Sequence, residues 1–265
     1  STNSAENLVA IESAVECAGA ITANTSALSF GISLRNSSLM GGTTVTATGN
    51  KLANISAVQS TIGISQTVSA GGSVSGQGLS LVATRFQVHN VLAAGSSLAT
   101  SANNLTGLLA TRNSNITIAA GTVNISSTTV GSVDLTDTIM QVNGDTQLSS
   151  AGTTIKLNMA FSSFDNTTGT LTASETGAGV SNGIVLKSSK LSSPIISAVG
   201  SLVNLSLDNS GCNVATLSVD SPTGAACVSM TNASTLTVTT RADITKIAGA
   251  DIVAGLTMSG ASKAI

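Results

Sequence analysis

Aliphatic residues alternate with Ser, Thr or Asn in short runs along most of the chain. The run LSFGISL covers residues 28–34, NITIAAGTVNIS covers residues 115–126, and TIKLNMAF covers residues 154–161. An alternation of period two places successive side chains on opposite sides of an extended backbone, which is typical of a half-buried strand and not of a helix. β-Branched residues favour such strands, and Gly, Asn and Ser favour the turns between them. The pattern therefore predicts many short strands.

The alternating runs recur with a period of about 25 residues. One recurring feature is an apolar residue, a few small polar residues and a second apolar residue. Its pairs are Leu34 with Leu39, Val58 with Ile62, Val82 with Phe86, Leu135 with Ile139, Phe161 with Phe164, and Leu186 with Leu191. The other feature is a glycine followed by a small, mostly polar residue, at Gly42, Gly72, Gly95, Gly121, Gly144, Gly169, Gly200, Gly224 and Gly249. We interpret the double glycine, Gly41 and Gly42, as a corner between two strands.

Three short strands and three turns fill a repeat of this length, which predicts one coil of a parallel β-helix per repeat. About ten coils of about 25 residues, stacked about 4.8 Å apart, would form a rod. We expect a right-handed winding, because parallel crossover connections are nearly always right-handed. The alternative fold is a β-sandwich filament subunit that is completed by a donated strand.

The residues that follow the repeated glycines would form a column if the coils stack in register. The hydroxyl residues of this predicted ladder are Thr43, Ser73, Ser96, Thr122, Thr170 and Ser201. Asp145, Ala225 and Ala250 interrupt it. One interpretation is that these side chains only solvate turns. The other is that they form a carbohydrate attachment row or an ice-facing array.

The N-terminal residues differ from the repeats and predict a short helical cap. In residues 4–20, Ser4 could cap a helix and Glu6 would lie in its first turn, with apolar residues near helical spacing behind them. We therefore divide the chain into an N-terminal cap or assembly segment, residues 1–26, and a solenoid, residues 27–265. The C-terminal residues carry no comparable cap, which predicts end-to-end self-association.

Composition removes several classes of function. Only 8% of the 265 residues are charged, and the formal net charge is -2, so the chain has no basic patch to attract nucleic acid or an anionic membrane. No apolar run approaches the roughly 20 residues of a membrane span. The chain starts at Ser1, which fits a processed secreted chain or a fragment of a longer one. We expect an extracellular or cell-surface location.

Candidate catalytic chemistry is sparse, and we predict no enzyme, no cofactor and no metal site. His89 is the only histidine, so a paired-histidine metal site is impossible. The acids Asp134, Asp137 and Asp145 come closest to the carboxylate group of a polysaccharide-processing enzyme, but the chain has no Trp or Tyr to stack a sugar ring. We interpret these acids as solvated turn residues.

Cysteines and glycosylation sequons are the remaining candidate modification sites. Cys212 and Cys227 could form a disulfide if the segment between them bends back at Pro222, or could be buried thiols, and Cys17 would be left over. The predicted N-glycosylation sites are Asn24, Asn36, Asn54, Asn104, Asn115, Asn124, Asn166, Asn204 and Asn232. In a secreted protein we expect several of them to carry glycans, because outward Asn side chains at faces and corners are accessible.

The rhythm of SSLMGGTTVTATGN and of NSNITIAAGTVNISS, carried over residues 28–258, resembles the β-helical repeats of large protist surface proteins, in particular the dispersed gene family proteins of trypanosomatids. The chain departs from that family in its few cysteines and aromatic residues. The resemblance implies a surface-displayed, adhesin-like, glycosylated β-helix. We therefore predict an extracellular structural protein, either a filament subunit or a segment of a cell-surface adhesin. The alternatives are an ice- or carbohydrate-binding solenoid and, last, a polysaccharide-processing enzyme.

Overall fold

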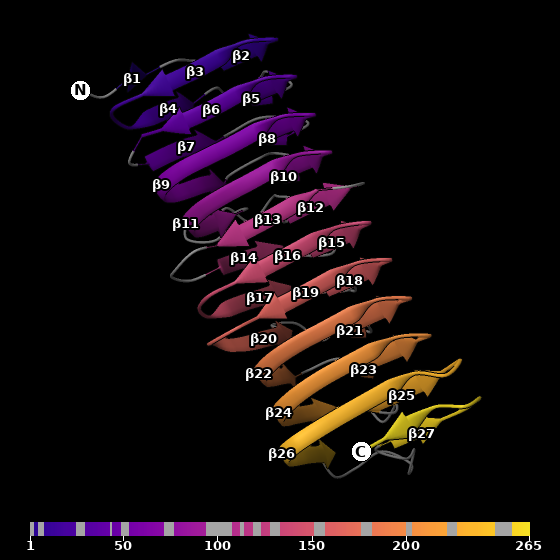
Figure 1. The fold of residues 1–265 in the computed structure, drawn as a ribbon. Coiled ribbons are helices and arrows are strands. Elements are labelled where there is room, and N and C mark those ends of the chain that lie inside the picture. The colour runs from indigo at the N-terminus through magenta and orange to yellow at the C-terminus, as the bar shows by residue number, and fades with distance from the viewer. Residues whose placement is uncertain are drawn as a thin grey trace.

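The computed structural model is a stack of parallel strands (Figure 1). It describes residues 3–4, 8–24, 30–42, 44–48, 53–71, 77–93, 108–111, 114–118, 123–127, 133–150, 157–175, 182–199, 203–221, 227–246 and 256–265. Within these residues every paired strand runs parallel to its neighbours. The fold is therefore a parallel β-solenoid, and the alternative of a β-sandwich is wrong.

The first face of the solenoid is an 11-stranded parallel sheet. Its strands are β2 (Leu8–Ile11), β5 (Phe30–Arg35), β8 (Ala53–Val58), β10 (Gln77–Val82), β12 (Leu108–Thr111), β15 (Val133–Thr136), β18 (Leu157–Ala160), β21 (Asn182–Lys187), β23 (Val203–Asp208), β25 (Val228–Thr231) and β27 (Leu256–Met258). Each strand pairs with the first-face strand of the next coil, so neighbours in space come from successive repeats.

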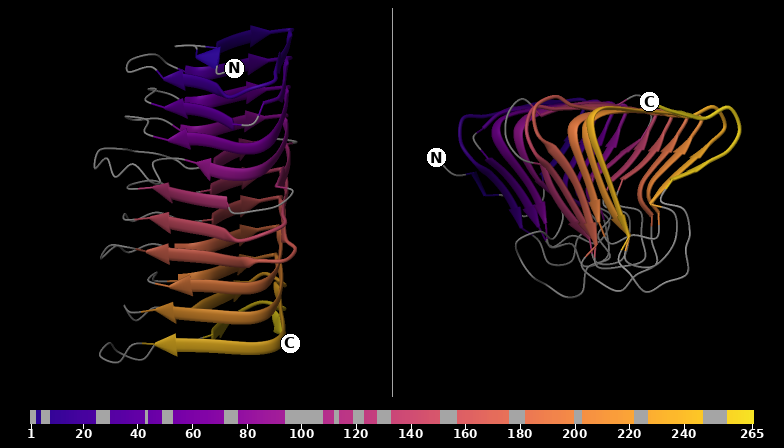
Figure 2. Two further views of the ribbon diagram at one scale, coloured as in Figure 1. Left: turned by 90° about the vertical axis from the view of Figure 1, so that its left-hand side faces the viewer. Right: turned by 90° about the horizontal axis from the view of Figure 1, so that it is seen from below.

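A 17-stranded sheet bends to form the second and third faces. Five strands run across both faces: β9 (Thr61–Gly71), β11 (Arg85–Ala93), β22 (Lys190–Val199), β24 (Gly211–Ser221) and β26 (Thr235–Lys246). The second face also contains β3 (Ala14–Cys17), β6 (Ser38–Gly41), β13 (Asn115–Ile118), β16 (Ile139–Val142), β19 (Ser163–Asn166) and β28 (Lys263–Ala264). The third face also contains β1 (Asn3–Ser4), β4 (Ile21–Asn24), β7 (Thr44–Thr48), β14 (Val123–Ser127), β17 (Thr146–Ser150) and β20 (Thr170–Glu175). Figure 2 shows the coils stacked from one end to the other.

Inward side chains form apolar columns that run along the stack. On the second face one column contains Leu39, Ile62, Phe86, Met140, Phe164, Leu191, Cys212 and Leu236, all buried. We call it the second-face column. On the third face one inward column is smaller, with Ala47, Ala173 and Ala198 fully buried, and the column beside it contains larger residues such as Val68 and Ile196. Stacked apolar side chains remove a continuous surface from water and so stabilise the rod along its length.

The N-terminal residues are strands, so the predicted helical cap is wrong. β2 and β3 pair with β5 and β6 in the same way as every later coil does. Ala10 and Cys17 are buried, whereas their neighbours Val9, Ile11 and Glu16 are exposed. This period-two burial outweighs the helical spacing of Leu8, Ile11 and Val15, because β5 and β6 of the following coil offer backbone groups to pair with.

The corner predicted at the double glycine is confirmed. Gly41 and Gly42 have φ values of +87° and +59° and connect β6 to β7. A Cβ atom at Gly41 would lie 2.7 Å from the carbonyl oxygen of Cys17 in the preceding coil. Only glycine fits both the left-handed backbone and the close approach of that strand.

Candidate functional site

A column of hydroxyl side chains, buried except at its two ends, follows the corner between the first and second faces. At most of the described corners a residue with positive φ, such as Glu12 at 49° or Phe161 at 51°, is followed by Ser or Thr. We call these hydroxyl residues the corner ladder. Its members are Ser13, Ser37, Ser60, Thr84, Ser114, Thr138, Ser162, Ser189, Ser210, Ser234 and Ser262. Ser and Thr suit this place because a short hydroxyl can bond to nearby backbone.

Hydrogen bonds join the rungs of the corner ladder from coil to coil. The Ser162 N–H donates to the Ser189 hydroxyl at 3.1 Å, and the Ser189 N–H donates to the Ser210 hydroxyl at 3.1 Å. Most of these hydroxyls also donate to a carbonyl of their own coil, as Ser189 does to Lys187 at 2.8 Å. The rungs are separated by as few as 21 and as many as 30 residues, yet their geometry is the same. The corner ladder therefore keeps successive coils in register.

The corner ladder differs from the ladder that the glycine series predicts. Thr43, Ser73, Ser96, Thr122 and Ser201 lie outside the described residues. Thr170 begins β20, and its N–H donates to the Asp145 carboxylate at 2.8 Å. The predicted ladder thus stays a prediction. The sequence signal for the corner ladder is a hydroxyl residue two places before each buried residue of the second-face column, as in Ser37 before Leu39.

The predicted glycosylation sites that the structure describes fall in three kinds of place: exposed corners, strands, and buried positions. Asn36 and Asn232 are exposed at corners, with φ values of 48° and 52°. The backbones of Asn24, Asn54, Asn115 and Asn124 lie in β4, β8, β13 and β14, and Asn104 lies outside the described residues. Asn166 and Asn204 are 1% and 0% exposed, so the expectation of an outward side chain is wrong for these two.

Each of these two buried amides makes a hydrogen bond to a residue in another strand. The Asn204 amide donates to the Asp220 carbonyl at 2.8 Å, and the Asn166 amide donates to the Ser193 hydroxyl at 3.3 Å. A buried amide retains partners of this kind because leaving it unpaired costs free energy. A glycan on either side chain would require it to leave the core.

The three cysteines are buried thiols outside any disulfide. Cys212 lies in the second-face column on β24, and Cys227 directly precedes β25 on the first face. The predicted Cys212–Cys227 disulfide is therefore not formed in this structure. Burial raises the pKa of the Cys212 thiol to about 12, so it is an unreactive apolar residue in the folded chain.

The candidate catalytic acids are not brought together. Asp134 lies in β15 on the first face, Asp137 is exposed at the next corner, and Asp145 is exposed between β16 and β17. The backbone of His89 lies in β11. Among the described residues, no group of three or more His, Cys, Asp or Glu side chains is arranged to hold a metal ion. That same part of the chain contains no helix that could cross a membrane.

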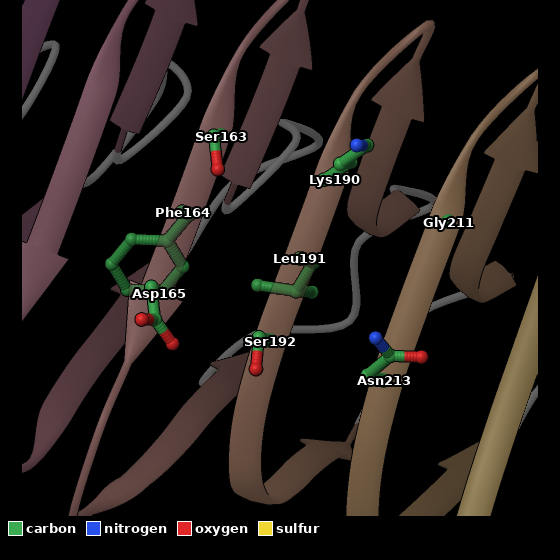
Figure 3. A pocket seen from close by; sticks show the side chains of 8 residues that line it. All are labelled: Ser163, Phe164, Asp165, Lys190, Leu191, Ser192, Gly211 and Asn213. Atoms are coloured by element: carbon green, nitrogen blue, oxygen red, sulfur yellow. The ribbon is translucent and has the colours of Figure 1, made fainter.

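A polar depression crosses three coils on the second face. Figure 3 shows its outward residues in two rows, Ser163, Lys190 and Gly211 in one and Asp165, Ser192 and Asn213 in the other. These rows follow the strand register of β19, β22 and β24. The depression has a volume of about 380 Å³. It is open at Gly211, where an added Cβ atom would have no neighbour within 4 Å.

The depression presents acceptors and donors of both charges within a small area. Asp165 offers a carboxylate, Lys190 an ammonium group, and Asn213 an amide that both donates and accepts. Phe164 and Leu191 are buried beneath the rows and fix the strands that carry them. This arrangement is not visible in the sequence, because its residues are about one coil apart in the chain.

The two ends of the solenoid expose strand edges and apolar side chains. Among the described residues, β2 and β3 pair on one side only, as do β27, β28 and residues 241–246 of β26. Val9 and Ile11 are 56% and 58% exposed at one end, and Met258 and Ile265 are 41% and 62% exposed at the other. Unpaired edges of this kind can pair with another chain.

These features define the class of the protein as a parallel β-solenoid with a corner ladder. A comparison with protein-family models finds no match, and comparisons with curated proteins and with solved structures likewise find none. The resemblance to the dispersed gene family proteins of trypanosomatids therefore stays a prediction.

Proposed function

We propose that this chain is an extracellular structural protein, a rod that serves as a filament subunit or as a segment of a cell-surface adhesin. The observation that carries this proposal is the continuity of the corner ladder beside the second-face column. Each coil repeats the same backbone pairing, the same buried apolar contact and the same hydroxyl bond. A stack of this kind resists separation of its coils because each coil contributes similar interactions with its neighbours.

The proposal includes a right-handed winding and about ten coils of about 25 residues. It also includes N-glycans on the outer surface. Asn36 and Asn232 support this part, since both are exposed at corners and both stand in sequons. A low content of charged residues, 8%, suits a surface that is covered by neutral sugars. The surface location is proposed from this chemistry and from the sequence resemblance.

Electron microscopy of negatively stained native material, with mass spectrometry of the intact chain, tests the proposed function. We expect thin rods of β-solenoid width and a mass above the 25.9 kDa of the bare chain. Native material that contains no rods, with a chain at the bare mass inside the cell, would contradict it. Peptide mapping should find glycans on Asn36 and Asn232 and none on Asn166 and Asn204.

Carbohydrate binding is the second candidate function, favoured by the polar depression. A carboxylate, an ammonium group and an amide can pair with the hydroxyl groups of a neutral sugar. Titration of oligosaccharides followed by NMR would report binding at Asp165, Lys190 and Asn213. Gly211→Leu is the most informative variant, because its side chain would block the depression at a position where there is open space for it. Loss of sugar-induced shifts in Gly211→Leu would support the site, and unchanged shifts would reject it.

A further inference from the structure

We propose that the C-terminal edge of the solenoid binds the N-terminal edge of a second copy of this chain, in a register that continues the solenoid. The N-terminal edge is β1, β2 and β3, and the C-terminal edge is residues 241–246 with β27 and β28. This inference rests on the proposed structural function and specifies its partner and its contact surface. Strand order, core columns, the corner ladder and charge each support it.

The order of strands at the two edges is complementary. At the N-terminal edge, β1 on the third face precedes β2 on the first face and β3 on the second. At the C-terminal edge, β27 on the first face and β28 on the second face follow residues 241–246 of β26, which lie on the third face. The next strand position is on the third face, above residues 241–246. β1 of a second copy fits that position, with β2 above β27 and β3 above β28.

The same register places matching side chains in the inward columns. Leu8 and Leu256 occupy the two ends of one first-face column, and Ala10 and Met258 occupy the two ends of the next. Leu8 and Leu256 are each partly exposed, and Met258 is 41% exposed. Stacking sets leucine against leucine and buries the methionine against an alanine. Apolar surface at both edges is removed from water in one contact.

The corner ladder has one open rung at each end. Inside the chain the Ser234 N–H donates to the Ser262 hydroxyl at 3.3 Å, and the Ser13 N–H donates to the Ser37 hydroxyl at 3.2 Å. Within the described residues no rung follows Ser262 and none precedes Ser13. The Ser13 hydroxyl donates to Ile11 and, like every other rung, can also accept. In a stacked pair the Ser262 N–H donates to the Ser13 hydroxyl of the next copy.

Charge at the two edges is of opposite sign. Residues 1–34 contain Glu6, Glu12 and Glu16 and no Lys or Arg. Residues 241–265 contain three basic residues and two acidic ones. The stacked register puts Lys263 beside Ala14 of the next copy, with Glu12 and Glu16 two residues away on either side. Cα atoms in such diagonal positions are about 8 Å apart, which a lysine side chain can span.

The first test compares two methionine substitutions in the 265-residue chain by sedimentation velocity and negative-stain microscopy. Met258→Lys puts a charge into the inward column at the C-terminal edge, where it remains solvated only while the chain is alone. Met40→Lys is the matched control, because Met40 is also 41% exposed but lies outside the inward columns, on β6, one coil inside the N-terminal edge. We expect the unmodified chain and Met40→Lys to form rods, and Met258→Lys to weaken assembly by about 100-fold or more.

The second test separates the edge rung from an interior rung. Ser13→Ala removes the acceptor for the next copy's Ser262 N–H while the Ser13 N–H keeps its bond to Ser37. We expect assembly to weaken about fivefold and thermal stability of the dissociated chain to stay the same. Ser189→Ala, an interior rung, should do the reverse by lowering thermal stability and leaving assembly unchanged.

The third test is a charge exchange. Lys263→Glu should weaken assembly and make it less sensitive to salt. The double variant Lys263→Glu with Glu16→Lys should recover a large part of the lost assembly, because each interface then regains an opposite pair.

The outcomes separate this inference from the proposed function. The inference would be overturned if the unmodified chain remained entirely monomeric at high concentration. It would also be overturned if Met258→Lys formed rods as well as the unmodified chain does. If native material nevertheless contained rods, the proposed structural function would still be supported. Assembly of the purified chain without rods in native material would support the inference and contradict the function.

Discussion

Two buried columns lie side by side along the solenoid and obey different rules. The corner ladder contains only Ser and Thr, whereas the second-face column ranges from Cys212 and Leu191 to Phe164. A rung must accept an N–H from one coil and donate to a carbonyl of its own, which only a short hydroxyl can do. An apolar position has only to fill space, and its neighbours adjust to its volume. The polar column thus sets register, and the apolar column supplies most of the burial.

The largest effect should come from opening the apolar column. Phe164→Ala removes a ring that is 2% exposed, and we expect a loss of about 3–5 kcal/mol in the free energy of unfolding, measured with urea. Phe161→Ala is the matched control, because Phe161 is 68% exposed only three residues earlier. Equal losses for the two variants would mean that the column does not carry the burial we assign to it.

A rung of the corner ladder should cost less to remove but tolerate fewer replacements. Ser189→Ala leaves the buried Ser162 N–H without its acceptor, for which we expect a loss of about 1–3 kcal/mol. Ser189→Thr should be nearly neutral, since Thr84 and Thr138 already serve as rungs. Exposed Ser192→Ala is the control. A Ser189→Ala variant as stable as this control would remove the ladder's role in register.

The thiol in the apolar column should make stability depend on pH. The pKa of Cys212 is about 12 in the folded chain against 9.0 for an ordinary thiol. The buried neutral thiol therefore contributes fully to the free energy of unfolding below pH 9. That contribution is lost as the pH rises from 9 toward 12, by up to about 1.4 kcal/mol per pH unit. Urea unfolding at several pH values, with Cys212→Val as reference, measures it. Parallel curves for the two proteins above pH 9 would contradict the assignment.

The smallest effect should be a gain in stability from replacing the positive-φ residue that directly precedes a rung of the corner ladder. Phe161 has a φ value of 51°, a conformation that Asn adopts at lower cost than an aromatic residue. Asn36 and Asn209 already occupy equivalent corners. We expect Phe161→Asn to raise the thermal midpoint by the equivalent of about 0.5–1 kcal/mol. A lower midpoint would show that the exposed ring makes a stabilising contact.

The strands and their parallel stacking could be predicted from the alternation and the repeat. Which apolar residues near each corner point inward could not. Leu186 and Leu191 mark the true inward positions on either side of a corner, whereas Phe161 and Ile139 are exposed. In a chain rich in Ser, any apolar residue near a corner fits the repeat, whether it points inward or outward. A shift of one residue in the assigned register moves each side chain to the opposite side of its strand. The N-terminal helix was wrong for a related reason, because strand pairing with the next coil is not visible in the local sequence.

The candidate sites were harder to predict than the fold. The corner ladder and the polar depression join residues that are about one coil apart, so their geometry appears only when the register is known. Sequons are local motifs, yet the burial of Asn166 and Asn204 depends on Ser193 and Asp220 in other strands. Local motifs could therefore be found in the sequence, but their environment could not.

The separation between rungs varies from 21 to 30 residues while the rungs themselves keep one geometry. The extra length between Thr84 and Ser114 falls after β11 and before β12, away from the corner. Coils of unequal length can thus be gained or lost by duplication without disturbing their neighbours. The same property makes the connection from the third face to the first a natural place to graft foreign peptides, displayed at intervals set by the spacing of the strands.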